Sequence, residues 1–413
     1  MGKNKKYNGY KAFQYLERGF DYKDIPLCKE FSRVPSYFVP LSKTEEERYE
    51  EFIEKNILIN LHTHPFLFPE DVNRVMELMN TGRGFTAYEA LSRSGLDCVF
   101  DNVMDGISYI TSYSGWKWTD VIHDIGIRLS DIHHQEMVIH CLRVRDIIDA
   151  FENGKVALVI CLESATPIEN ELDRIDVLYG LGVRSLGICY SESNMLGGAR
   201  DLDIGLTDFG YDAVKRMNKL GMLIDRGHAN NRTVLEAIEA SDKPIYVSHS
   251  GPTALTSVKR VKQPVSQEEM MQALAEKEGL FAVGSAGWGA RTEKNPVGNI
   301  EGYMECVEYC IELMGIDHVG CGPDTTYGDH QGMYRHWFAH ERTFGHYERP
   351  GKERRERRQI PEGMEDPGYV VGLENPNEFV NIARWMILHG YSDGEISKIV
   401  GSNALKLLEK VWV

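Results

Sequence analysis

The chain lacks the features by which membrane-spanning, nucleotide-binding and secreted proteins are usually recognised. Its 413 residues contain no uninterrupted apolar run of about 18 residues, so no segment is expected to cross a bilayer. No GxGxxG or Walker motif follows an apolar run, so nucleotide binding has no support. The first twenty residues carry positive charge but no apolar stretch typical of a secretory signal, and we expect a cytoplasmic protein.

Paired cysteines and concentrated basic charge are also scarce. The eight cysteines include no CxxC pair, and several lie in apolar runs where a buried thiol is the ordinary expectation. The formal net charge is -16, and glutamates interrupt the one dense basic run, at residues 352–358. Because phosphate binding needs a basic surface, we do not expect nucleic acid as a partner.

Short apolar runs instead alternate with amphipathic stretches of helical length along most of the chain. Runs of strand length begin at eight points, near residues 57, 96, 156, 183, 222, 244, 280 and 318. Among the stretches between them, residues 171–181 repeat their apolar side chains at near-helical spacing. This alternation favours an α/β fold, a (β/α)8 TIM barrel, over an open doubly wound sheet.

Three segments lie outside this rhythm. Residues 1–55 are predicted to be an N-terminal extension that packs on the barrel domain, residues 56–413, and that ends in a helix with Ser42 and Glu45 at capping-box spacing. Residues 325–371 follow the last strand with little apolar periodicity, and are predicted to be a long insertion, either functional or loosely ordered. Two C-terminal helices, near 377–389 and 392–411, are expected to close the chain.

Five of the apolar runs end at or near a side chain that metals bind or that bases use. In a parallel barrel the carboxyl ends of the strands meet on one face, and barrel enzymes carry their active sites there. The sequence therefore predicts that these side chains gather in one site. In chain order they are His62 and His64, Glu163, His228, His249 and Asp324.

Each of these residues also has an ordinary structural explanation. The His-x-His pair can cap a turn, Glu163 can form a buried salt bridge, and Asp324 can cap a turn or helix. His228 and His249, taken singly, are more often hydrogen-bonded histidines of a core or loop. Five coincidental placements are harder to accept than one shared site.

Together the residues predict a binuclear metallohydrolase. His62 and His64 share a face because they are two residues apart on one strand, so both can bind one ion. Glu163 ends a buried apolar run, where a carboxylate is costly unless it is paired or coordinated, and it can bridge two cations. The two histidines of later strands can hold a second ion, and an ionised Asp324 can take a proton from a metal-bound water.

Longer patterns surround these residues: Gly205-Leu206-Thr207-Asp208-Phe209-Gly210, residues 217–228 and 244–250, and residues 315–324, with Gly372-Leu373-Glu374-Asn375 and Gly401-Ser402-Asn403 near the end. They resemble the membrane (renal) dipeptidase family, peptidase family M19, within the amidohydrolase-like metal-dependent hydrolases. The resemblance spans roughly residues 57 to 410 and is most specific over 205–250.

The resemblance implies a (β/α)8 barrel that holds two divalent ions, with Zn²⁺ the expected metal. It assigns His228 and His249 to one ion, His62 to the other, Glu163 to a bridge between them and Asp324 to proton transfer. It further implies that Arg260 binds the carboxylate of the substrate, for which a guanidinium fork is suited.

Two residues depart from the family pattern. His64 stands where the family has an aspartate, so the site gains positive charge and its metal preference can shift. Tyr190 stands where the family has a histidine that contacts the tetrahedral centre, and its phenol can donate a hydrogen bond to an oxyanion. We therefore expect Tyr190 to serve both catalysis and substrate binding, and His64 to serve as a metal ligand.

The expected function is that of a zinc-dependent dipeptidase, in which a metal-bridging water hydrolyses dipeptides, including those with a D-configured C-terminal residue. One alternative is a binuclear hydrolase of another small amide, cyclic amide or lactone, motivated by His64 and Tyr190. Another is a non-catalytic metal-binding protein. A small molecule is the expected partner, without nucleic acid or membrane, and a homodimer is the default for barrel enzymes.

Overall fold

The computed structural model describes residues 5–31, 33, 36–103, 117–190, 193–199, 202–255, 263–285, 290–330, 332 and 370–413. Arg260 and most of the predicted insertion, 325–371, lie outside these residues. Among the helices of the described ranges, none combines the length and the apolar character that a membrane crossing requires.

One parallel sheet holds a strand for each of the eight apolar runs. Its order is β11-β10-β9-β8-β7-β6-β4-β1-β12, so strands that follow one another in the chain are mostly neighbours in space. The strands that match the runs are β1 (Ile59–His64), β4 (Cys98–Val103), β6 (Val156–Leu162), β7 (Val183–Cys189), β8 (Leu223–Gly227), β9 (Tyr246–Ser250), β10 (Leu280–Val283) and β11 (Val319–Cys321).

The two ends of this strand order are joined by three residues, 322–324. They connect β11 to β12 (Thr325–Thr326), which pairs in parallel with β1. The backbone N–H of Asp324 donates to the carbonyl of His62 at 3.1 Å, and a Cβ at Gly322 would lie 3.1 Å from Cβ of His62. The end of β11 therefore lies against β1 and the sheet closes on itself, which confirms the predicted TIM barrel.

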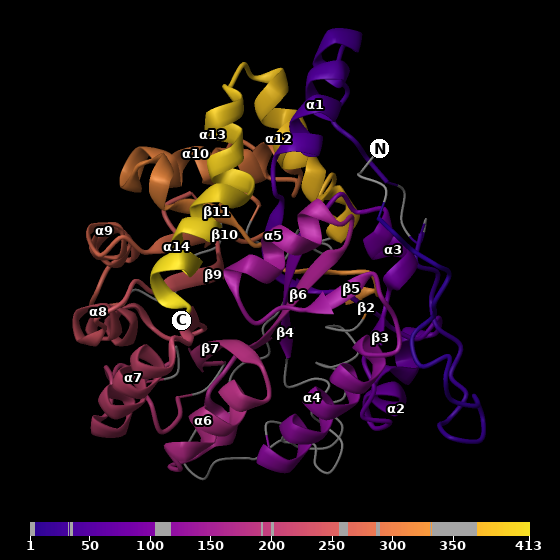
Figure 1. The fold of residues 1–413 in the computed structure, drawn as a ribbon. Helices are drawn as coiled ribbons and strands as arrows, with labels where there is room; N and C mark the ends of the chain where they lie inside the picture. The colour runs from indigo at the N-terminus through magenta and orange to yellow at the C-terminus, as the bar shows by residue number, and fades with distance from the viewer. Residues whose placement is uncertain are drawn as a thin grey trace.

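Helices cover the outside of the sheet, as Figure 1 shows most clearly for α6 to α10. Side chains cap several of them: Thr207 accepts from the backbone of Gly210, and Asn230 from that of Thr233, so each cap satisfies an N–H that the first helical turn leaves unpaired. The outer helices are α4 (Trp118–Ile132), α6 (Asp173–Gly180), α7 (Asp208–Leu220), α8 (Asn231–Ala240), α9 (Gln267–Glu276) and α10 (Ile300–Met314). The buried side chains of α5 (Val144–Glu152), Ile147 and Ala150, belong instead to the cluster of the strand interiors.

The apolar core has two layers, because successive strand residues point to opposite faces. On β6, Ala157, Val159 and Cys161 belong to the interior cluster, and Glu163 continues the same face at the carboxyl end. The interior cluster also contains apolar residues of α14 (Asn403–Val411) and the ring of Trp412. Because α14 packs on residues near the strand starts, it covers the end of the barrel opposite Glu163.

Shorter elements and the chain ends surround the barrel. The predicted capping box of Ser42 and Glu45 is confirmed at the start of α1 (Lys43–Lys55). Lys5, from the N-terminal segment, forms a fully buried ion pair with Asp97 at 2.6 Å. The remaining elements are β2 (Phe66–Leu67), η1 (Val72–Arg74), α2 (Val75–Met79), β3 (Phe85–Thr86), α3 (Tyr88–Ser92), β5 (Val138–His140), η2 (Thr166–Ile168), η3 (Ile316–His318), η4 (Pro376–Phe379), α12 (Val380–Leu388), α13 (Asp393–Ser397) and the π-helical η5 (Lys398–Ser402).

Candidate metal centre

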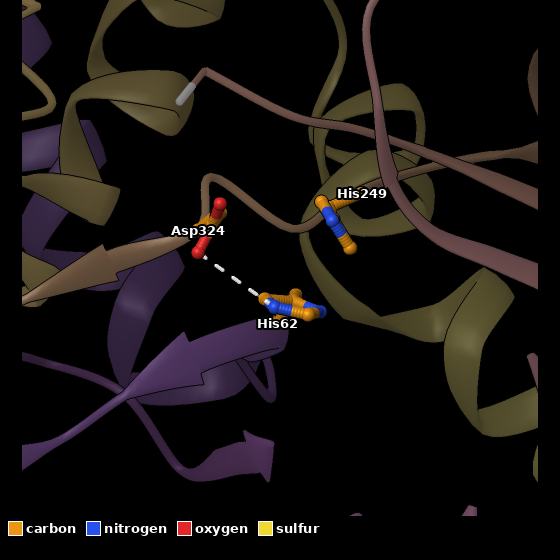
Figure 2. Close-up of side chains that lie close together, drawn as sticks. All are labelled: His62, His249 and Asp324. Atoms are coloured by element: carbon orange, nitrogen blue, oxygen red, sulfur yellow. Dashed lines mark ion pairs between the residues drawn. The ribbon is translucent and has the colours of Figure 1, made fainter. Parts of the chain in front are cut away.

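The six side chains at the predicted strand ends converge on the carboxyl end of the barrel. They come from five places in the chain: the last residues of β1, the residue after β6, the residue after β8, the fourth residue of β9 and the link between β11 and β12. Asp324, His62 and His249 lie close together in Figure 2, with the carboxylate of Asp324 turned toward the ring of His62.

Glu163 lies at the middle of this group. Its Oε1 is 2.8 Å from Nε2 of His228, 3.7 Å from Nε2 of His249 and 3.9 Å from Nε2 of His62. One carboxylate oxygen thus faces imidazoles from three different strand ends. This is the arrangement expected of a carboxylate shared between two groups of ligands.

Asp324 lies on the other side of His62. Its Oδ1 is 3.7 Å from Nε2 of His62 and 3.3 Å from Nε2 of His64. The backbone of Asp324 has a φ of 59°, in the left-handed region that few non-glycine residues adopt, although aspartate and asparagine tolerate it better than most. Its N–H bond to the carbonyl of His62 helps to hold this conformation.

Two glycines leave room for the backbone of Glu163. A Cβ at Gly187, on β7, would overlap the carbonyl oxygen of Glu163, and a Cβ at Gly227 would lie 2.8 Å from the same atom. Gly227 also has a φ of 56°, directly before His228. The orientation of two predicted ligands thus depends on the absence of side chains at neighbouring positions.

Replacing Gly187 with alanine is expected to lower the free energy of unfolding by about 1–3 kcal/mol, because the new methyl group must displace the Glu163 backbone. The same change should weaken the binding of a divalent metal ion by this group. Chemical denaturation and zinc titration measure the two effects. Gly180, at the end of α6, is the matched control: nothing lies within 4 Å of its Cβ position, so Gly180→Ala should leave metal binding unchanged and should not lower the free energy of unfolding. Equal effects at the two glycines would contradict the steric argument.

Burial sets the charge state of the group when no cation is present. Removal from water raises the pKa of Glu163 to about 8, lowers the pKa of His249 to about 4 and lowers that of His62 well below its usual range. These two imidazoles are therefore neutral near pH 7, the form that binds metals. The charge of His64 lowers the pKa of Glu163 but does not outweigh the effect of burial.

The pKa values of Asp324 and His64 also depend on the hydrogen bond between the two side chains. Burial alone would raise the pKa of Asp324, but the hydrogen bond with His64 and the nearby imidazoles of His62 and His330 lower it well below its usual range. Burial also opposes protonation of His64, yet its bond to Asp324 outweighs this effect and raises its pKa. Asp324 is therefore ionised at neutral pH.

The donor set fits divalent metal ions. Three groups of potential ligands occur in the described residues: His62 with His249 and Asp324, His62 with His64 and Glu163, and Glu163 with His228 and His249. Nε2 of His62 is buried and has no hydrogen-bond partner among the described residues, although an unsatisfied buried nitrogen is costly. Imidazole nitrogens and carboxylate oxygens are the ligands that Zn²⁺ takes in catalytic sites.

Of the two remaining predicted site residues, one lies among the residues that the structure describes and the other does not. Tyr190 directly follows β7, and its ring centroid lies 4.4 Å from that of His228, so the tyrosine borders the group of candidate ligands. Arg260 lies outside the described residues, and its role stays a prediction.

Sequence reasoning missed several side chains that contact this group. Asp225 and Ser248 lie within segments that carried the family resemblance, but only their histidine neighbours were assigned roles. Alternation along β8 and β9 from the interior residues Leu223 and Tyr246 would have indicated them. His330 is buried near His64, with ring centroids 6.4 Å apart, and nothing in its sequence context indicated this placement.

Solved structures of similar fold include proteins from two bacteria. An amidohydrolase from Pseudomonas aeruginosa matches with a TM-score of 0.66 and 23% identity, over 88% of this chain and 99% of that one. A metallopeptidase from Rhodobacter sphaeroides, liganded with a phosphinate mimic of the dipeptide L-Ala-D-Ala, matches with a TM-score of 0.63 and 17% identity, over 87% of this chain and 100% of that one. At these identities the likeness establishes the fold.

Curated relatives match over shorter stretches. The dipeptidase tcpJ of Claviceps purpurea is 24% identical over 272 residues, which are 64% of this chain and 53% of the relative. An uncharacterised dipeptidase of Schizosaccharomyces pombe is 27% identical over 188 residues, 43% of this chain and 44% of the relative. The chain therefore aligns with only about half the length of these two proteins.

A family model decides the classification. The model of the membrane dipeptidases, peptidase family M19, matches residues 48–333, a range that contains all the strand-end residues described above and most of the chain. This match agrees with the resemblance seen in the sequence. The chain belongs to the membrane dipeptidase family, peptidase family M19.

Proposed function

We propose that this chain is a zinc-dependent dipeptidase that also accepts dipeptides with a D-configured C-terminal residue. One observation carries the proposal: four imidazoles and two carboxylates from separate strand ends gather at one end of the barrel, with Glu163 common to two potential ligand groups. Membership of the dipeptidase family supports the reaction. The phosphinate mimic of L-Ala-D-Ala bound by the Rhodobacter sphaeroides relative supports the D-configured substrate.

In this proposal His62, His64 and Glu163 hold one ion, and Glu163, His228 and His249 hold the other. When bound, the two ions would lower the pKa of a shared water and polarise the scissile carbonyl. The negative charge of Glu163, which burial disfavours in the metal-free protein, would then be compensated. His64 takes the position of a family aspartate, so this site carries one negative charge fewer.

Asp324 is proposed to carry the proton. Its carboxylate is ionised near neutral pH, as described above, and it can accept a proton from the attacking water. As the peptide bond breaks, the same carboxyl group returns this proton to the leaving amine. Tyr190 would donate its phenolic hydrogen bond to the oxyanion, and Arg260 would bind the C-terminal carboxylate of the substrate.

A panel of dipeptides tests the proposal. Zinc-loaded protein is expected to hydrolyse L-Ala-L-Ala and L-Ala-D-Ala, and chelation should abolish both rates. Arg260→Ala should raise KM, because it removes the partner of the substrate carboxylate. Absence of dipeptide hydrolysis at any zinc loading would contradict the proposal. Turnover of a cyclic amide or lactone that is indifferent to Arg260→Ala would support the alternative hydrolase instead.

Other properties stay predictions from the sequence. They are the cytoplasmic location, the homodimer, the lack of nucleic-acid partners and the division between residues 1–55 and 56–413. The assignment of residues 325–371 as one long insertion also stays a prediction, although Thr325 and Thr326 within it form β12.

A further inference from the structure

Asp225 and Ser248 form a buried pair beneath the candidate metal centre. Asp225 is on β8 and Ser248 on the neighbouring β9, with 1% and 0% of their surfaces exposed. Oδ1 of Asp225 accepts from the backbone N–H of Ser248 at 2.9 Å, and Oδ2 accepts from the Ser248 hydroxyl at 2.6 Å. The carboxylate therefore fixes both the backbone and the hydroxyl of Ser248.

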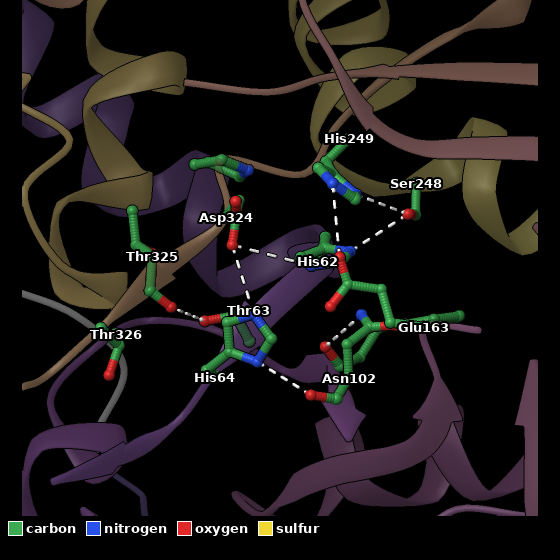
Figure 3. Close-up of polar contacts among 12 residues, drawn as sticks. His62, Thr63, His64, Asn102, Glu163, Ser248, His249, Asp324, Thr325 and Thr326 are labelled. Atoms are coloured by element: carbon green, nitrogen blue, oxygen red, sulfur yellow. Dashed lines mark hydrogen bonds and ion pairs between the residues drawn. The ribbon is translucent and has the colours of Figure 1, made fainter. Parts of the chain in front are cut away.

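The same hydroxyl contacts two of the proposed metal ligands. Ser248 Oγ lies 3.1 Å from Nδ1 of His62 and 2.9 Å from Nδ1 of His249. Figure 3 shows Ser248 joined by dashed lines to both rings. In the proposed function these two histidines serve different ions, so one oxygen atom touches both halves of the centre.

Counting protons fixes the direction of these hydrogen bonds. A hydroxyl has one hydrogen and two lone pairs, and the Ser248 hydroxyl donates its hydrogen to Oδ2 of Asp225. The hydrogen of Ser248 is therefore committed to Asp225, and its two lone pairs must accept from Nδ1–H of His62 and Nδ1–H of His249. A neutral imidazole carries a single N–H, so Nε2 of both rings is left unprotonated. Those Nε2 atoms face Glu163, at 3.9 Å from His62 and 3.7 Å from His249.

We propose that Asp225 and Ser248 are positioning residues that hold His62 and His249 in the same tautomer, with the proton on Nδ1 and the Nε2 lone pair free for metal. A single hydroxyl thereby prepares a ligand for each ion at once. The inference rests on the metal centre of the proposed function and deepens it, but it does not depend on which bond the enzyme cleaves. Partners that fix ligand tautomers in this way are commonly important to metal affinity.

His64 provides an internal comparison. Its Nδ1 lies 2.8 Å from the backbone carbonyl of Asn102, which can only accept, so the tautomer of His64 is set without Ser248. A change at Asp225 or Ser248 should therefore alter His62 and His249 and leave His64 as it is. A general loosening of the barrel would affect all three rings.

Asp225→Asn is the sharpest variant because it keeps the shape of the side chain. The backbone N–H of Ser248 retains the amide oxygen as its acceptor, which turns the amide NH₂ toward the Ser248 hydroxyl. The hydroxyl must then accept from the amide and give its own hydrogen to one of the two rings. That ring loses its Nδ1 proton and carries it on Nε2, where it blocks metal binding. The same logic explains why an isosteric amide disables a histidine in other enzymes.

Nuclear magnetic resonance of full-length, metal-free protein with ¹⁵N-labelled histidine reads the tautomers directly. Spectra of His62→Gln and His249→Gln variants assign the two rings. We expect Nδ1–H at both rings in the wild type, and an Nε2–H signal from one of them in Asp225→Asn, with His64 unchanged. Nε2–H at either ring of the wild type would overturn the inference.

Zinc affinity gives a second readout. In competition with a chromogenic chelator, Ser248→Ala and Asp225→Asn are expected to bind Zn²⁺ about 10–100-fold more weakly, whereas Ser248→Thr, which keeps the hydroxyl, should restore most of the affinity. Ser185→Ala is the matched control, since Ser185 is also buried in the barrel but contacts the hydroxyl of Tyr246 at 2.9 Å. It should bind zinc within about twofold of the wild type, as expected for a serine that touches no ligand.

Wild-type zinc affinity in both Ser248→Ala and Asp225→Asn would overturn the inference. Circular dichroism identifies which variants fold, and Ser248→Ala carries the affinity test if Asp225→Asn does not. Failure of the dipeptidase proposal would be seen separately, as wild-type protein that binds zinc with Nδ1–H histidines but hydrolyses no dipeptide.

Discussion

Asp324→Asn is expected to lower kcat for dipeptide hydrolysis by about 10²–10⁴-fold, the range that general acid–base groups contribute. The amide has nearly the same shape as the carboxylate but cannot take a proton from water. The fold should tolerate the change, because asparagine is one of the few residues that readily adopts the φ of 59° found at this position. Steady-state kinetics on L-Ala-D-Ala, with metal content measured on the same samples, checks this result.

Asp317→Asn is the matched control for Asp324→Asn. Asp317 is a more exposed aspartate whose Oδ1 lies 2.7 Å from Nζ of Lys398, away from the strand ends. The control should retain full activity. Two outcomes would contradict the proposed role of Asp324: a rate close to that of the wild type, or loss of the bound metal, which would make Asp324 a ligand and not the proton carrier.

Glu163→Gln is expected to have the largest effect on metal binding. A neutral amide replaces the carboxylate that both proposed ligand groups share, so zinc content should fall from two ions per chain to fewer than one, and hydrolysis should be lost. Elemental analysis after dialysis against micromolar zinc measures the content. Retention of two ions would show that Glu163 does not bridge them.

The same variant should have the opposite effect on the stability of the metal-free protein. The pKa of Glu163 is about 8 in the folded state, above its value in the unfolded chain, so the folded state binds more protons between these values. The free energy of unfolding therefore falls as pH rises through this window, by on the order of 1.4 kcal/mol per unit. Glu163→Gln removes this pH-dependent fall in the free energy of unfolding. At pH 8, metal-free Glu163→Gln should therefore unfold at a higher denaturant concentration than metal-free wild type. Near pH 4.5 the two proteins should unfold at similar concentrations.

A reversed order, with the variant less stable at pH 8, would contradict the idea that Glu163 is a buried charge that its neighbours do not fully compensate. Glu301→Gln, in α10, offers a comparison at a glutamate whose Oε2 accepts from Nε1 of Trp385 at 2.7 Å. A pH-dependent increase in the free energy of unfolding that occurs in Glu163→Gln but not in Glu301→Gln would associate the effect with the metal centre.

The barrel strands could be predicted because burial on both faces leaves a continuous apolar run in the sequence. β6, from Val156 to Leu162, is the clearest case, with all seven residues buried. The closing strand could not be predicted in this way. β12 consists of Thr325 and Thr326 alone, and its place beside β1 depends on pairing with residues about 260 positions earlier, which no local pattern records.

The candidate ligands could also be predicted from their positions, and strand alternation could have indicated Asp225 and Ser248, whereas the backbone irregularity at His62 could not be predicted. His62 and Leu61 are adjacent and would point to opposite faces in a regular strand. Leu61 nevertheless lies against Gly320 of β11, and His62 against Gly322 in the link that follows β11. The pairing of β1 with β4 shifts register between Asn60 and Thr63, which accounts for this placement. Such an irregularity has no signature in the sequence of β1.

The most direct test of the account is the stepwise addition of Zn²⁺ to metal-free protein while the hydrolysis of L-Ala-D-Ala is followed. If Glu163 joins two ions at the strand ends, activity should be absent without metal and should saturate at two equivalents per chain. Saturation at one equivalent would contradict the shared role of Glu163. A metal-loaded, folded protein that hydrolyses no dipeptide would contradict the proposed function itself.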